Sequence, residues 1–201
     1  MPESRKARTL YFVRHAEPLF PDGERVYLGR RLDYPLCAEG KRQAEAVAET
    51  LAAAGVTAVF TSPLTRCRET ADAIARRVGC TPAVLEDLTE LDPGLWEGRT
   101  VRSVREEYGE AFEKGLCFPP PGGETDAAGM LRAQAALSVI RKSSGNIAVV
   151  SHGGLIRILL DCLRKPAPGT RSLYDIRCAV PIPVTETEDG RCTLDPRFLR
   201  A

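Results

Sequence analysis

The sequence contains only two histidines, nearly balanced charges and no long apolar run. Its 201 residues carry 28 basic and 27 acidic side chains, a formal net charge of +1. This total indicates neither nucleic acid nor a membrane surface as a partner. No apolar stretch approaches the ~20 residues that cross a bilayer, and Arg14 interrupts the short run after the basic N-terminus too early for a signal peptide. We therefore expect one cytoplasmic domain over residues 1–201.

The seven cysteines lack the clustering of a disulfide framework or a metal site. Their number is odd, they are widely scattered, and no two have C-x-x-C spacing. H-x-x-x-H and H-E-x-x-H are absent, as are the G-x-S-x-G of a serine hydrolase and the G-x-x-x-x-G-K-[ST] of a P-loop. We expect reduced thiols, no metal and no cofactor.

The chain does contain short apolar runs that alternate with longer helical ones. Ser62 fits an N-cap, with Pro63 at the first helical position and Gly79 beyond the end. The tail 172–194 mixes β-branched residues with prolines, which is typical of edge strands. This alternation predicts an α/β fold, three layers (αβα) around a mostly parallel sheet. Strands are predicted at 9–13, 57–62, 82–86 and 146–152, and helices at 39–55, 62–79, 101–114, 125–142 and 155–164.

Both histidines follow predicted strands. His15 comes after the first strand, beside Arg14; His152 comes after the fourth, and Arg66 follows the second. The carboxyl ends of parallel strands meet at one edge of a sheet, where ligands bind. Alone, each histidine could be an ordinary core or loop residue. We expect the four side chains to lie together at that edge.

These residue types suit a phosphoryl group. The planar arginine fork matches phosphate oxygens and never loses its charge. The helix start at Ser62 and the glycines Gly153 and Gly154 can add backbone N–H donors. A histidine nucleophile must be neutral, and nearby arginines lower its pKa.

Five segments, in order, resemble the histidine phosphatase superfamily, which includes cofactor-dependent phosphoglycerate mutase. They are FVRHAEP, TSPLTRCRETA, LTELDPGLWEG, PPPGGET and VVSHGGLIR, and they run from residue 10 to about residue 157. The resemblance implies a phosphoglycerate mutase-like fold. LGRRLDYPLCAEG and DPGLWEG look more like the small-phosphatase branch, which includes α-ribazole 5'-phosphate phosphatases and broad-specificity phosphatases.

The resemblance also implies a role for each matching residue. His15 would be the nucleophile that becomes phosphohistidine. Arg14, Arg66 and His152 would bind the phosphoryl oxygens, with Gly153 beside them.

The acid would come from TELDPG. Glu90 would protonate the leaving oxygen and then activate water, with Asp92 as a nearby competitor. Glu97 is less suited to act directly, and Trp96 beside it is expected to pack.

Two further features concern substrate choice. Arg30 and Arg31 could contact a second anionic group, or they could be solvated surface residues. Segment 101–125 is expected to form a lid or wall of the site.

The sequence departs from the family pattern after its first histidine. The family usually has glycine there, then a hydroxyl residue and an asparagine, where this chain has Ala16, Pro18 and Pro21. Alanine can replace that glycine only if φ stays negative. The lost asparagine removes one hydrogen bond to phosphate.

The resemblance implies a metal-independent phosphomonoester hydrolase that acts on a small phosphorylated metabolite, α-ribazole 5'-phosphate or a similar nucleotide or sugar phosphate. Two alternatives stay open: a cofactor-dependent phosphoglycerate mutase and a non-catalytic sensor of a phosphorylated ligand. Fold and residues shared by both branches do not separate hydrolase from mutase.

Overall fold

A six-stranded sheet forms the central layer of the molecule. The computed structural model describes residues 7–20, 22–113, 120–165 and 173–199. The strands are β1 (Arg8–Arg14), β2 (Val56–Thr61), β3 (Ala83–Val84), β4 (Asn146–Ser151), β5 (Pro181–Glu186) and β6 (Cys192–Leu194). They lie in the order β3-β2-β4-β1-β5-β6. The first four run parallel, and β5 and β6 add antiparallel pairings at one side.

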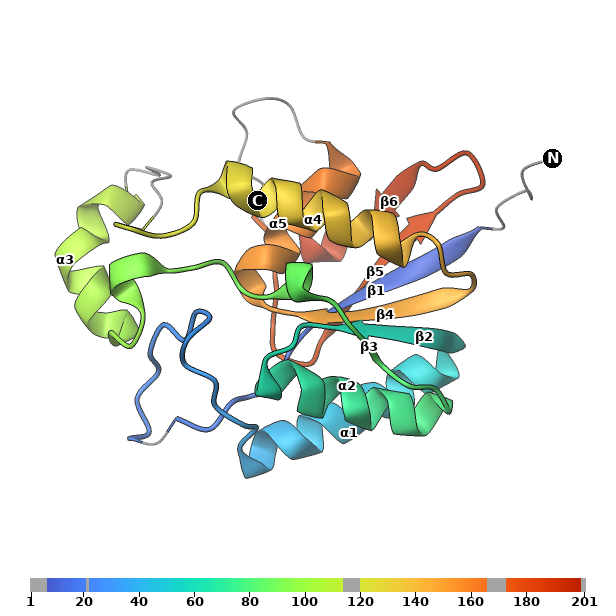
Figure 1. Cartoon of the computed structure of the whole chain (residues 1–201), viewed down its shortest axis with the longest axis horizontal. Helices are drawn as coiled ribbons and strands as arrows, with labels where there is room; N and C mark the ends of the chain where they lie inside the picture. The colour runs from blue at the N-terminus through green and yellow to red at the C-terminus, as the bar shows by residue number, and fades with distance from the viewer. Residues whose placement is uncertain (1–6, 21, 114–119, 166–172, 200–201) are drawn as a thin grey trace.

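Helices cover both faces of the sheet, so the molecule has three layers (Figure 1). The helices are α1 (Ala38–Ala53), α2 (Thr65–Val78), α3 (Val101–Glu113), α4 (Asp126–Ile140) and α5 (Gly153–Arg164). Neighbouring residues of β1 pack into opposite cores, Phe12 with α4 and α5 and Val13 with α1 and α2. A strand buried on both faces needs apolar side chains in succession, as at Leu10, Phe12 and Val13 of β1. The predicted three-layer α/β fold is confirmed.

Helix α2 begins at Thr65, so the predicted N-cap at Ser62 is wrong. Leu64 occupies the cap position, and its side chain makes no capping hydrogen bond. The carboxylate of Asp33 caps the helix instead. Its oxygens accept hydrogen bonds from the Thr65 backbone N–H (2.8 Å) and hydroxyl (2.7 Å). A cap supplied from a distant loop leaves no local signal at the helix start.

The prediction that the tail forms edge strands is only half correct. β6 is an edge, but β5 lies between β1 and β6. Pro181 and Pro183 fit inside β5 because β6 pairs only with Val184–Glu186. The first half of β5 therefore bonds to β1 alone, and proline is tolerated where one side of a strand is unpaired.

Helix α1 packs tightly against the segment that follows β1. A Cβ at Gly40 would lie 2.0 Å from the carbonyl oxygen of Glu17, so only glycine permits this approach. The same oxygen accepts a hydrogen bond from the backbone N–H of Cys37 (3.1 Å). These contacts position the chain directly after His15.

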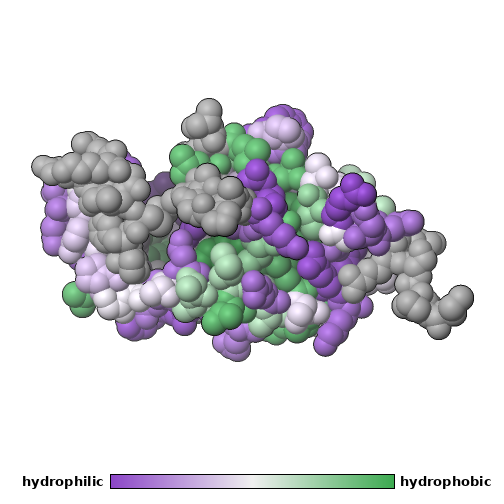
Figure 2. Space-filling model, turned by 90° about the horizontal axis from the view of Figure 1, so that it is seen from above, coloured by the Kyte–Doolittle hydropathy of each residue, from purple (hydrophilic) through white to green (hydrophobic). Residues whose placement is uncertain are grey.

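The surface carries exposed apolar side chains on one helix. Seen from above, hydrophobic residues gather near the middle of the molecule (Figure 2). Met130, Leu131 and Val139 of α4 are among the exposed large apolar residues. No helix in the described residues is long and apolar enough to cross a lipid bilayer.

Candidate active site

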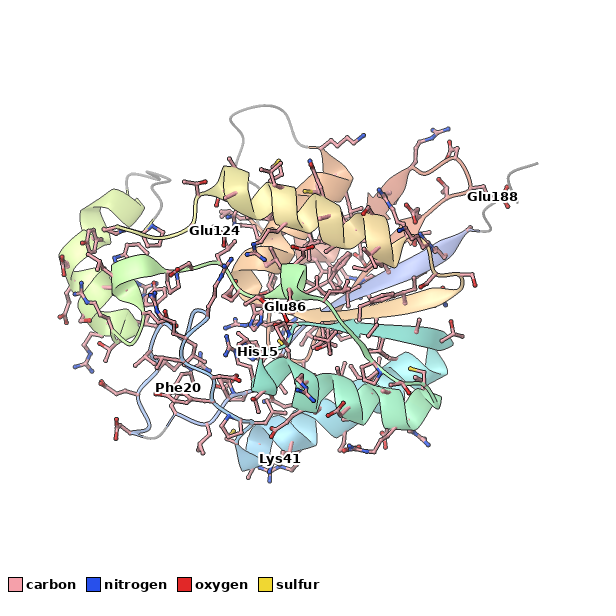
Figure 3. All side chains as sticks on the ribbon, in the orientation of Figure 1. His15, Phe20, Lys41, Glu86, Glu124 and Glu188 are labelled. Atoms are coloured by element: carbon pink, nitrogen blue, oxygen red, sulfur yellow. The ribbon has the colours of Figure 1, made fainter. Side chains whose placement is uncertain are left out.

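A cavity of about 520 Å³ opens where the parallel strands end. Arg14 and His15 reach it from the end of β1, Arg66 from α2, and Gly153 from the start of α5. β2, β4 and β1 are neighbours, so the segments that follow them converge. Glu90 completes this group of lining residues. Figure 3 shows His15 at the end of the strands that faces α3.

His15 has the protonation pattern of a nitrogen nucleophile. Its side chain is 4% exposed, and Nδ1 lies 2.8 Å from the carbonyl oxygen of Ala16. A carbonyl can only accept, so Nδ1 holds the proton and Nε2 keeps its lone pair. Burial and the charges of Arg66 and Arg14 lower the pKa of His15 to about 3. The ring is therefore neutral near pH 7, as nucleophilic attack requires.

This lowered pKa predicts a loss of stability in mild acid. The unfolded chain takes up a proton below the ordinary pKa of 6.5, whereas folded His15 does so only near 3. Stability is therefore present above pH 6.5 and is lost as the pH falls toward 3. Between about pH 7 and about pH 5, His15 should lower the free energy of unfolding by roughly 2 kcal/mol.

Urea unfolding of the wild type and of His15→Gln at both pH values measures this effect. The variant should lose less stability on acidification, since its side chain does not titrate. Equal losses in the two proteins would contradict a neutral buried His15. The remaining pH dependence of the variant should include a contribution from His152, whose pKa burial and Arg66 hold well below its usual value.

His152 lies beside His15 but is fully buried. The two ring centroids are 5.3 Å apart, with the planes inclined by 61°. His152 Nε2 lies 2.9 Å from the Ser62 hydroxyl and 3.3 Å from Cys67 Sγ. It is not among the described residues that line the cavity. Its contact with a phosphoryl oxygen stays a prediction, because Nε2 would first have to leave Ser62.

Arg14 and Arg66 bring unpartnered N–H groups to the cavity. Arg66 is only 1% exposed, and its Nη atoms donate to the carbonyls of Gly29 (2.8 Å) and Leu32 (3.1 Å). Arg14 Nη1 donates to the carbonyl of Ile176 (3.4 Å). In the described part of the chain, the buried Nε atoms of both arginines have no hydrogen-bond partner. Such donors are costly to bury alone, and an anion's oxygens would satisfy them.

The carboxylate of Glu90 rests on the first turn of α5. Its oxygens accept hydrogen bonds from the backbone N–H groups of Gly154 (3.3 Å), Leu155 (3.1 Å) and Leu91 (2.9 Å). The positive end of the helix dipole also favours a carboxylate there. The start of α5 therefore holds Glu90 at the cavity, on the same side as Gly153.

Gly154 is required for this position of Glu90. A Cβ on Gly154 would lie 2.7 Å from Glu90 Oε1, whereas one on Gly153 would meet only Arg14 atoms, at 3.7 Å or more. We expect Gly154→Ala to displace Glu90 and lower kcat for phosphate esters of poor leaving groups, by about tenfold or more. The matched variant Gly153→Ala should lose less, since it adds the same methyl group. A larger loss in Gly153→Ala would contradict this assignment.

An ion-pair cluster holds the loop that carries Glu90. Arg132 donates to carbonyl oxygens of residues 87–90 at 2.9 to 3.5 Å, and its side chain pairs with Glu124 (2.8 Å). Burial would raise the pKa of Glu124, but hydrogen bonds and charges from Arg132 and Arg30 lower it overall. Glu124 therefore stays ionised and keeps the cluster together.

Arg30 belongs to this cluster rather than to the cavity wall. Its Nε donates to the carbonyl of Glu90 (2.7 Å), and its Nη2 pairs with Glu124 (2.6 Å). Arg30 is not among the described lining residues. A contact between Arg30 and the substrate stays a prediction, and in this structure its Nε and Nη2 are engaged by the protein.

The neighbouring acids and Trp96 have structural contacts. Arg31 pairs with Glu97 (2.6 Å) and, at 3.5 Å, with Asp92. Glu97 also accepts a hydrogen bond from the Arg31 backbone N–H (2.5 Å). Trp96 is buried and packs against Tyr27, with ring centroids 5.5 Å apart. These contacts hold the loop of residues 92–97 against Arg31 and Tyr27.

The departures from the family pattern are accommodated locally. Ala16 is fully buried, and its φ is not among the positive values of the described non-glycine residues. Its backbone N–H donates to the Thr70 hydroxyl (3.1 Å). Pro18 is buried and forms an isolated bridge with Leu36. Pro21 lies outside the described residues.

Segment 101–125 contributes to one side of the cavity. Val101, Pro120 and Glu124 line it, while residues 114–119 lie outside the described part of the chain. A wall at this position agrees with the geometry. Movement of the segment as a lid stays a prediction.

Sequence reasoning missed the part of the cavity wall that comes from residues 17–28. Lining residues from this wall are Glu17, Phe20, Arg25, Val26, Tyr27 and Leu28. The described residues of this stretch form isolated bridges to residues 36, 97 and 100 rather than a strand of a sheet, so no periodic pattern marks it. Glu124 lay within the quoted PPPGGET segment, but only its contacts with two arginines reveal its role.

The remaining predictions concern metal ions and the cysteines. Within the described ranges, no group of His, Cys, Asp and Glu side chains is arranged to hold a metal ion. Cys37, Cys67, Cys80, Cys162, Cys178 and Cys192 are free thiols. Cys117 lies outside the described residues.

The fold and the cavity define an α/β protein of the phosphoglycerate mutase-like type. The family profile described as "Histidine phosphatase superfamily (branch 1)" matches residues 10–195. The chain belongs to this superfamily, whose members are phosphatases or mutases that act through phosphohistidine. The resemblance seen in the sequence is confirmed.

Some relatives of this chain are named as mutases and others as phosphatases. "Probable phosphoglycerate mutase GpmB" of Klebsiella pneumoniae is 35% identical over 179 residues, which cover 85% of this chain and 82% of that protein. A mycobacterial glucosyl-3-phosphoglycerate phosphatase, solved in complex with VO3, is 26% identical with a TM-score of 0.82 and covers 94% of this chain and 97% of its own. An alpha-ribazole phosphatase from Shigella flexneri shares the fold, with a TM-score of 0.76 and 24% identity, and covers 96% of each chain.

Proposed function

We propose that this protein is a metal-independent phosphomonoester hydrolase that acts through a phosphohistidine at His15. One observation carries the proposal: His15, with its Nδ1 against the Ala16 carbonyl, lines the same cavity as Arg14 and Arg66, whose buried Nε atoms have no hydrogen-bond partner in the described residues. Membership of the superfamily supports it. The VO3 bound in a structure that is 26% identical supports a phosphoryl site as well.

In the first step, His15 Nε2 attacks the phosphorus of the ester. The N–P bond forms as the P–O bond to the leaving group breaks, while Arg14 and Arg66 bind the non-bridging oxygens. Glu90, in its protonated form, donates its proton to the leaving oxygen. The products are an alcohol and phosphohistidine.

In the second step, water replaces the alcohol. Glu90, now a carboxylate, takes a proton from the water as its oxygen bonds to phosphorus and the N–P bond breaks. Inorganic phosphate leaves, and His15 recovers its lone pair. The cycle needs no metal and leaves both side chains unchanged.

Hydrolysis and phosphoryl transfer differ only in the acceptor. A phosphoglycerate mutase must hold a second, acidic acceptor at the phosphohistidine, and the relatives named phosphoglycerate mutase keep that alternative open. We propose water as the acceptor, and the pairing of two cavity-lining arginines, Arg25 and Arg157, with carboxylates of the protein supports this choice. We propose a cytoplasmic hydrolase of a small phosphorylated metabolite, such as α-ribazole 5'-phosphate or a similar nucleotide or sugar phosphate, without nucleic acid or membrane partners.

The test is release of phosphate from p-nitrophenyl phosphate at mildly acidic to neutral pH in the presence of a chelator. A parallel assay follows conversion of 3-phosphoglycerate to 2-phosphoglycerate. Hydrolysis without isomerisation is the expected result. Isomerisation would identify a mutase, and tight phosphate binding without either reaction would identify a sensor.

A further inference from the structure

The outer part of the cavity is largely apolar. Besides Arg14 and Arg66, aromatic and aliphatic side chains from residues 20–28, 91 and 101 line the cavity. They are Phe20, Val26, Tyr27, Leu28, Leu91 and Val101. A volume of about 520 Å³ is ample for a phosphate group and an aromatic ring together.

Backbone hydrogen bonds hold this apolar wall in place. Tyr27 donates to the carbonyl of Arg99 (3.0 Å) and accepts from the N–H of Gly98 (2.8 Å). Val101 donates to the carbonyl of Arg25 (3.0 Å). The Tyr27 ring also packs on buried Trp96. The wall is therefore a formed surface rather than a loose loop.

The outer arginines of the cavity are neutralised by the protein itself. Arg25 pairs with Glu17 (2.8 Å), and Arg157 pairs with Asp126 (2.7 Å) and, at 3.7 Å, with Asp161. A second anionic group of a substrate would therefore have to compete with a carboxylate of the protein for either arginine.

Besides Glu90, four carboxylates among the described residues line the cavity, and each of them is already paired with an arginine of the protein. They are Glu17, Asp92, Glu124 and Asp126. A second negative charge on the substrate would lie near them while Arg14 and Arg66 bind the phosphate, and bringing an unpaired charge there is unfavourable.

We infer that the cavity selects phosphate esters whose leaving group is uncharged and largely apolar, such as an aromatic alcohol or a neutral nucleoside, and discriminates against substrates with a second anionic group. This inference rests on the proposed function and deepens it. The inferred substrate differs from phosphoglycerate, the compound in the names of the phosphoglycerate mutase relatives, because phosphoglycerate carries a carboxylate. Glu17 is the specificity-determining residue, because it occupies the guanidinium that a substrate carboxylate would otherwise bind.

The experiment compares 3-carbamoylphenyl phosphate with 3-carboxyphenyl phosphate, which match in shape and differ in charge. We expect kcat/KM to favour the carbamoyl ester by about tenfold or more. Glu17→Gln frees Arg25 and should reduce this ratio several-fold. The control Glu45→Gln removes the carboxylate from a surface pair with Arg76 that is remote from this cavity, and should leave the ratio unchanged.

A ratio near one, or a preference for the carboxy ester, would overturn the inference. So would an unchanged ratio in Glu17→Gln. Binding of both esters to His15→Ala, measured by calorimetry, tests selection without turnover. If neither ester is hydrolysed but the carbamoyl ester binds more tightly, the selection is upheld and the hydrolase function fails. Equal binding together with no hydrolysis would overturn both.

Discussion

Replacement of His15 by alanine is expected to lower kcat/KM for p-nitrophenyl phosphate by at least about 10³-fold. The variant lacks the nitrogen lone pair that would form the N–P bond, while Arg14 and Arg66 still bind phosphate. Release of p-nitrophenol gives the rate. Rapid quenching into base should trap a base-stable, acid-labile phosphoenzyme in the wild type and none in the variant.

Four controls separate loss of chemistry from loss of fold. Thermal unfolding should show that His15→Ala folds, and inorganic phosphate should still raise its melting temperature, because binding to the folded state stabilises it. Cys178→Ala changes another cavity-lining side chain and is expected to alter the rate only slightly. Added imidazole should restore part of the activity of His15→Ala by filling the site of the lost ring. Hydrolysis at the wild-type rate in His15→Ala would exclude a phosphohistidine at this position.

The second large effect is expected for Glu90→Gln. Loss of a general acid costs about 10²–10⁴ in rate when the leaving group needs a proton. We therefore expect a loss in this range for an alkyl phosphate and a much smaller loss for p-nitrophenyl phosphate, whose leaving group is stable as an anion. A plot of log kcat against leaving-group pKa should become steeper in the variant.

Asp92→Asn is the matched control, since Asp92 also lines the cavity and lies two residues from Glu90. Asp92 Oδ1 accepts a hydrogen bond from the Gly94 backbone N–H (2.8 Å) and pairs with Arg31, contacts typical of a loop residue. Its variant should keep the wild-type dependence on leaving group. If Glu90→Gln loses the same factor with every leaving group, Glu90 does not protonate the leaving oxygen. If Asp92→Asn shows the steeper plot, Asp92 is the acid.

Much of this organisation could be read from local patterns. Continuous apolar runs identified β1, β2 and β4 within one or two residues, because strands covered on both faces carry apolar side chains in succession at their centres. Arg14 and His15 stand at the end of one such run, and His152 at the end of another. The predicted start of α2 was wrong because its cap, Asp33, is about thirty residues away.

The sequence by itself determined the α/β layers, the edge of the sheet where ligands bind and the superfamily, since each depends on periodicity, on strand ends or on short ordered segments. Only the tertiary structure decided which nitrogen of His15 carries the proton, that Arg30 pairs with Glu124, and that Arg25 pairs with Glu17. The physical reason is that these features depend on contacts between residues far apart in the chain, or on the direction in which a side chain points. Hydrogen bonds and ion pairs form between groups that folding brings together, and no local pattern records where a guanidinium or an imidazole points.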